Sequence, residues 1–202
     1  MHAAEAADTI TETAEEKRHE AREKFRNRAA VIIAILASVM AVCELGGDNA
    51  KNGMIDNNIK ASDTWAFYQA KNVRQTDYRL AADSLKRAVA DAGLSEAGRA
   101  GAQADLDKYE KTAARYEDDP GKDGKKQLEA RAKGYEEARD VSHERAESFD
   151  YAQMLLQLAI VLGSVSILAV SHRLLLVAGV LGAVGAALCL NGLLLVVPLP
   201  GG

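Results

Sequence analysis

Charged residues are separated from apolar ones along this chain, and this separation limits the possible folds more than any other feature. No Asp, Glu, Lys or Arg occurs in residues 29–43, 151–171 or 174–202. Nearly all of the charge lies in residues 1–28 and 44–150. A soluble helix mixes the two classes, because one face packs on a core while the other meets water. The pattern predicts a membrane protein, although 27% of the residues are charged.

Three membrane spans are expected. Residues 174–197 can cross the hydrocarbon core as a tilted helix, and residues 151–170 are also long enough. Only a tight hairpin fits between these two spans. Residues 29–45 form a weaker first span, which we interpret as an uncleaved helix rather than a signal peptide, because many acidic residues precede it. The fold class is therefore all-α, with three transmembrane helices.

Basic residues near the span ends predict the orientation, since cytoplasmic flanks are enriched in Lys and Arg. Six of them lie in residues 1–28, within reach of the first span, and the hairpin loop adds Arg173. Only four lie near the spans on the other side. We expect residues 1–28, a charged segment, and the hairpin loop to be cytoplasmic, with residues 46–150 outside.

Residues 46–150 are expected to form an extramembrane helical domain. Alanine and charged residues dominate residues 59–119, and these favour helix. Residues 46–58 are rich in Gly and Asn, so we interpret them as a linker, with a helix beginning near Ser62. Ser95 restarts a second helix, and the third can continue without interruption into the second span.

Apolar and small side chains recur at close to heptad spacing on these helices. The stripes are Ala61, Trp65, Tyr68, Asn72, Gln75, Ala82, Leu85 and Val89 on the first helix; Leu106, Tyr109, Ala113 and Tyr116 on the second; and Leu128, Tyr135, Ser142 and Phe149 on the third. They predict a helical hairpin or coiled coil with its tip near residues 93–98, although a fold-back at Pro120 stays open. The stripes contain few large aliphatic residues, which favours association between chains.

No pattern typical of catalysis, cofactor binding or metal binding occurs. The four histidines are scattered, and the glycines of residues 121–126 lack phosphate-loop spacing. A net charge of −4 argues against nucleic-acid binding. No catalytic, cofactor-binding or metal-ligating residue is assigned, no cofactor is expected, and the protein is not expected to be an enzyme. Cys43 and Cys189 lie in apolar stretches and are interpreted as apolar filler rather than as a disulfide.

Two groups of residues in the spans are candidates for helix packing. Small residues of the third span recur at four-residue spacing, which permits close helix approach in lipid. They include Ala178, Gly179, Gly182, Ala183 and Ala186. Packing within one chain and packing between chains both stay open. Gln153 and Asn191 lie at similar depth and predict an interhelical hydrogen bond rather than a conduction path.

Residues 60–75 contain the candidate interaction motif, formed by Trp65, Tyr68, Gln69 and Lys71. It predicts either packing against the third helix or an aromatic docking surface near the membrane interface, where Trp and Tyr are favoured.

The same segment, KASDTWAFYQAKNVRQ, resembles a bacterial membrane-protein family catalogued as domain of unknown function four-three-three-seven. The similarity takes in the leading span, the Trp-x-x-Tyr-Gln-Ala-Lys core and the closing pair of spans, over most of residues 25–195. This resemblance implies the fold and a multi-pass location in the bacterial inner membrane, but no activity.

The function expected is a non-catalytic scaffold or accessory interaction subunit. Its expected partners are the lipid bilayer, further copies of the chain as a homo-oligomer, and a second membrane protein. The alternative function is an oligomeric pore or transport component.

Overall fold

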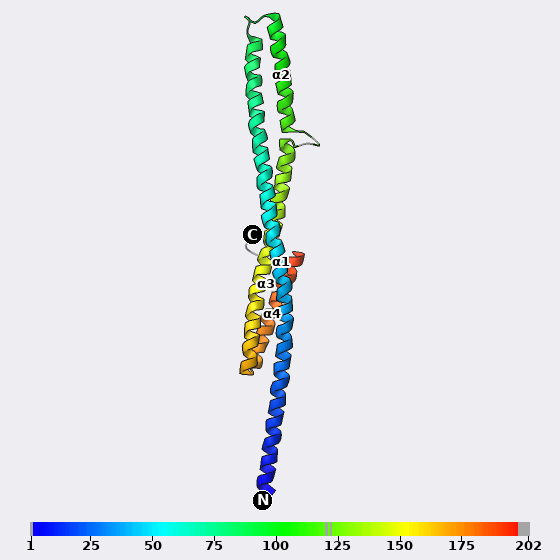
Figure 1. The fold of residues 1–202 in the computed structure, drawn as a ribbon, viewed down its shortest axis with the longest axis vertical. Helices are drawn as coiled ribbons and strands as arrows, with labels where there is room; N and C mark the ends of the chain where they lie inside the picture. Colours follow the sequence, from blue (N-terminus) through cyan, green and yellow to red (C-terminus); the bar gives the residue numbers. More distant parts are fainter. Residues whose placement is uncertain (1, 120, 122, 198–202) are drawn as a thin grey trace. The chain divides into compact units, whose positions relative to one another are not determined.

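The computed structural model describes residues 2–119, 121 and 123–197, and these residues form four helices and no strand. The helices are α1 (His2–Ala90), α2 (Glu96–Glu117), α3 (Lys125–Ala169) and α4 (His172–Leu194) (Figure 1). Each of α1, α3 and α4 contains a stretch that is long and apolar enough to cross a membrane. The all-α fold with three candidate spans is therefore confirmed.

The predicted linker over residues 46–58 is wrong, because α1 continues through it and does not begin near Ser62. Gly46 and Gly47 lie against the Phe149 ring of α3. A Cβ atom on Gly46 would lie 2.6 Å from Phe149 Cζ, so no side chain fits there without displacing the ring. These glycines allow two helices to approach closely, and the packing offsets their low helix propensity.

The chain divides into two compact units, which are described separately. The first unit draws on residues 1–52 and 142–202 and contains the early part of α1, the later part of α3, and α4. These three segments run side by side (Figure 1). Their core is small and apolar and comprises Leu36, Cys43, Ala50, Ala146, Phe149, Ala152, Leu156, Ala159 and Cys189. Both cysteines are buried and free.

The ends of α3 and α4 differ by a few residues from the predicted spans. Helix α3 ends at Ala169, and the chain reverses at Val170, whose φ is 49°, and Ser171, which caps α4. Helix α4 ends at Leu194 rather than Val197. The physical reason lies in Asn191, whose side chain accepts from Val197 N at 2.9 Å and donates to Val197 O at 2.8 Å, turning the chain back.

The second unit comprises residues 53–141, in which α1 pairs antiparallel with α2 and then with the start of α3. Three contacts mark the progression: Lys86 with Glu110, Tyr78 with Tyr116, and Trp65 with Glu136. Residue numbers fall along α1 as they rise along its partners, so α3 continues in the direction of α2 (Figure 1). The hairpin prediction is confirmed, and the fold-back alternative is not adopted.

The tip of this hairpin lies between Ala90 and Glu96. Asp91 Oδ1 accepts from Gly93 N at 2.9 Å, and Ser95 Oγ accepts from Gly98 N at 3.2 Å. Ser95 is therefore the N-cap of α2, as the sequence predicts. Gly93 does not cap α1 directly, since that helix ends three residues earlier.

Candidate functional site

The predicted motif divides between two faces of α1. Trp65 Nε1 donates to Glu136 Oε1 of α3 at 2.9 Å, and the Trp65 ring meets Tyr68 edge-on at a centroid distance of 5.3 Å. Lys71 Nζ donates to the backbone oxygen of Asp123. Gln69 is exposed. Trp65, Tyr68 and Lys71 thus hold α1 to α3 and to the residues just before it. This is the first of the two predicted alternatives, packing against the third helix.

A buried polar network lies one to two turns further along α1 and was not recognised in the sequence. Gln75 is only 1% exposed. Its Nε2 donates to Ala113 O and to Glu117 Oε2, both at 2.9 Å, and its Oε1 accepts from Lys125 Nζ at 3.0 Å. Lys125 is also buried, and its ammonium lies 5.2 Å from the centre of the Tyr68 ring. The network therefore joins α1, the end of α2 and the first turn of α3.

The charges of this network compensate one another. The hydrogen bond from Gln75, followed by the attraction of Lys125 and Arg79, lowers the pKa of the Glu117 carboxyl. Lys125 Nζ lies 3.4 Å from Glu117 Oε2, so the buried ammonium has a counter-charge. The sequence does carry a signal for this site, since Lys125 precedes Leu128, Ala132 and Tyr135 at core spacing on one helix face. A lysine at such a position requires a polar partner.

Replacing Gln75 by leucine is expected to destabilise the hairpin by about 2 kcal/mol, because Lys125 and Ala113 O lose a buried hydrogen-bond partner. Gln103→Leu is the matched control, since Gln103 is exposed and bonds only to Asp107 on its own helix. Chemical unfolding in detergent, followed by circular dichroism, measures both variants. Equal changes in the two variants would contradict a structural role for the network.

The opposite side of α1 carries a stripe of exposed residues with a single charge, and no described residue covers it. We call it the outer stripe; it comprises Ile55, Ile59, Ser62, Ala66, Gln69, Ala70, Val73, Thr76, Asp77, Leu80 and Ser84. All of these side chains are exposed, and Asp77 is the one charged member. Ile55 is 52% exposed and Leu80 62%. Surface helix faces are ordinarily charged or polar, so this stripe is unusual for a face left in water.

The small residues of α4 also divide between two faces. Ala178 and Gly182 are buried in the first unit, and a Cβ atom on Gly182 would lie 2.4 Å from Leu36 Cδ2 of α1. Ala186 is half-buried. Ala183 is exposed, and nothing lies within 4 Å of a Cβ atom placed on Gly179. One small-residue face therefore packs within the chain, and the other is open.

Gln153 and Asn191 each form an interhelical hydrogen bond, but not with one another. Gln153 Nε2 donates from α3 to Cys43 O of α1 at 3.5 Å. Asn191 Nδ2 donates from α4 to Ser148 Oγ of α3 at 3.3 Å. Their polar groups thus hold helices together, as such groups commonly do in lipid.

No group of three His, Cys, Asp or Glu side chains that could hold a metal ion occurs in the described part of the chain. The best-defined features are therefore surfaces between helices: the buried network, the outer stripe and the packed face of α4.

Comparison with known proteins gives a family and no individual relative. No curated protein and no solved structure matches the chain. A family model described as Domain of unknown function (DUF4337) matches residues 25–195, which include all three spans and the hairpin. Since this match covers most of the 202 residues, the chain belongs to that family.

Proposed function

We propose that the protein is a non-catalytic, membrane-anchored interaction subunit whose helical hairpin pairs with a second copy through the outer stripe. The observation that carries this proposal is the stripe itself: eleven exposed positions over residues 55–84 with a single charge. We call the near-heptad positions of α1 from Ala61 to Val89 the inner stripe. The inner and outer stripes lie on opposite sides of α1, because successive residues turn by 100°. Pairing through the outer stripe therefore leaves the hairpin intact.

A second copy is the partner that fits the stripe best. Ile59, Ala66, Val73 and Leu80 follow one another at seven-residue intervals, which is the repeat of a helix that pairs with a similar helix. Membrane anchoring gives every copy the same orientation and raises its local concentration, so equivalent stripes can meet in parallel. A symmetric pair buries the same side chains on both chains.

The experiment introduces two negative charges into the stripe. Val73→Glu with Leu80→Glu places like charges opposite one another in a parallel pair, so the protein is expected to change from oligomer to monomer. The control carries Ala114→Glu with Ala130→Glu, two exposed positions on α2 and α3. Native mass spectrometry and light scattering in mild detergent give the mass. A monomeric unaltered protein, or an oligomer that the stripe variant leaves intact, would contradict the proposal.

The rival function, a pore or transport component, makes a different prediction for liposomes. The proposed subunit is expected to release no more entrapped ion or small solute than empty liposomes do. The proposal is supported by the lack of Asp, Glu, Lys and Arg in residues 29–43, 151–171 and 174–197, since transporters commonly place such residues inside the membrane. A flux that rises with protein concentration would favour the pore.

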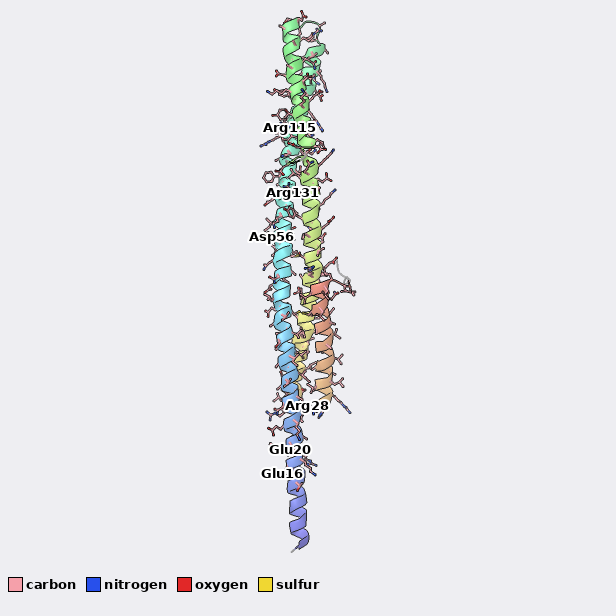
Figure 2. The ribbon with its side chains drawn as sticks, turned by 90° about the vertical axis from the view of Figure 1, so that its right-hand side faces the viewer. Glu16, Glu20, Arg28, Asp56, Arg115 and Arg131 are labelled. Atoms are coloured by element: carbon pink, nitrogen blue, oxygen red, sulfur yellow. The ribbon has the colours of Figure 1, made fainter. Side chains whose placement is uncertain are left out.

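The proposed orientation places the start of α1 in the cytoplasm of a bacterial cell and the hairpin outside. A membrane-impermeant thiol reagent added to intact cells is expected to label Arg115→Cys and not Glu20→Cys; both positions are exposed (Figure 2). The unaltered protein serves as the blank, because Cys43 and Cys189 are buried. Labelling of Glu20→Cys alone would invert the orientation.

A further inference from the structure

A groove of about 740 Å³ lies in the first unit, between the early part of α1 and the end of α3. One wall carries Arg22, Glu23 and Arg26 of α1. The other wall is apolar and is formed by Ile167 and Leu168 at the end of α3 and by Val170 just after it. The groove therefore combines positive charge with an apolar surface where a candidate membrane span ends.

Packing holds this part of α1 in place. Phe25 is 5% exposed, and its ring lies 4.5 Å from that of His172 at the start of α4. Ala29, one turn further, is fully buried. Glu20 and Arg28, labelled in Figure 2, bracket the segment. Because contacts with α4 hold this segment of α1 in place, the groove is already formed before any ligand enters.

The two arginines are free to bind an anion. Arg22 and Arg26 are one helical turn apart and are exposed, and neither forms an ion pair with any described side chain. Lys24, on another face, is already paired with Glu20 at 3.3 Å. Guanidinium groups match phosphate oxygens with two parallel hydrogen bonds. Glu23 offsets one of the two positive charges, so Arg22, Glu23 and Arg26 together give the groove wall a net charge of +1.

The apolar wall distinguishes a lipid from a free anion. Leu168 is 85% exposed, more than any other large apolar side chain among the described residues. An acyl chain lying along Leu168 and Ile167 would cover this surface, with the headgroup phosphate at Arg22 and Arg26. Basic pockets at the cytoplasmic ends of spans are suited to anionic headgroups.

We propose that this groove is a binding site for one anionic phospholipid, held by Arg22 and Arg26 at its phosphate and by Ile167 and Leu168 along its acyl chain. The site serves the anchoring of α1 at the membrane surface and is independent of pairing through the outer stripe.

The test uses the full-length protein in detergent, with added phosphatidylglycerol, phosphatidylcholine or inorganic phosphate as separate probes. Native mass spectrometry counts bound lipid, and thermal unfolding reports its effect. Phosphatidylglycerol is expected to bind with a stoichiometry of one and to raise the unfolding temperature more than phosphatidylcholine. Inorganic phosphate at the same concentration is expected to have no effect. Equal binding of both lipids, or an equal effect of phosphate, would overturn the proposal.

Charge variants localise the binding. Arg22→Gln and Arg26→Gln are each expected to weaken phosphatidylglycerol binding about fivefold, and the double variant about thirtyfold. Glu23→Gln is expected to strengthen it, and this result does not depend on the arginine variants folding normally. Lys17→Gln with Arg18→Gln is the matched control on the same flank. If this control weakens binding as much as the arginine pair does, the attraction is diffuse and the groove is not the site.

Discussion

Phe149→Ala is expected to lower the stability of the first unit by about 3 kcal/mol or more, since it removes a fully buried ring. Phe149 is 2% exposed, and its ring lies against Gly46, Gly47 and Gly192. Glycines have no side chain that could move into the space, so the cavity would persist.

Thermal unfolding in mild detergent, followed by circular dichroism, measures this effect. Tyr151→Ala is the matched control, because Tyr151 is an aromatic residue two positions further along α3 that is 48% exposed. It is expected to shift the unfolding temperature only slightly. Similar shifts in the two variants would show that the ring does not hold α1, α3 and α4 together.

The elements that could be predicted from the sequence are those whose signal is local and repeated. Absence of charge marked the candidate spans, because each needs about twenty apolar residues in a row. Core spacing marked the inner stripe, and Ala61, Gln75 and Ala82 are buried as predicted. Ser95 as an N-cap is a local hydrogen-bonding signal, which propensity alone can supply.

The prediction of a linker over residues 46–58 was wrong because intrinsic helix propensity is a weak signal compared with tertiary contacts. Gly46 and Gly47 look like helix breakers until the Phe149 ring is placed against them. Nothing close in sequence to the glycines identifies a phenylalanine about one hundred residues away. The Gln75–Lys125 hydrogen bond was missed for the same reason, since its two ends come from different helices.

The interaction motif shows a limit of predicting exposed surfaces from helix periodicity. Trp65 and Tyr68 were singled out as aromatic residues, yet both are half-buried and face α3. Gln69, which drew attention only as their neighbour, lies in the exposed outer stripe. Periodicity identifies faces of a helix, but it does not say which face is already covered by the same chain. Only the placement of α2 and α3 resolves that question.

Gly182→Leu and Ala183→Leu form the second decisive experiment, because adjacent residues of α4 face opposite environments. The sequence alone left open whether Gly182 packs within one chain or between chains. The structure places Leu36 of the same chain 2.4 Å from a Cβ atom at this position. Gly182→Leu is therefore expected to separate α4 from α1 and to destabilise the first unit by about 3 kcal/mol, the upper end for overpacking.

Ala183→Leu enlarges the exposed face of this candidate span, where Ala183 is not covered by the described part of the chain. If copies associate through the outer stripe, Ala183→Leu leaves both the unfolding temperature and the oligomer mass unchanged. If copies instead associate through the open Gly179 and Ala183 face, this variant alone dissociates the oligomer, since close approach in lipid requires small residues. Measuring mass and thermal stability for both variants separates packing within one chain from packing between chains. A stable Gly182→Leu monomer would contradict the contact with Leu36.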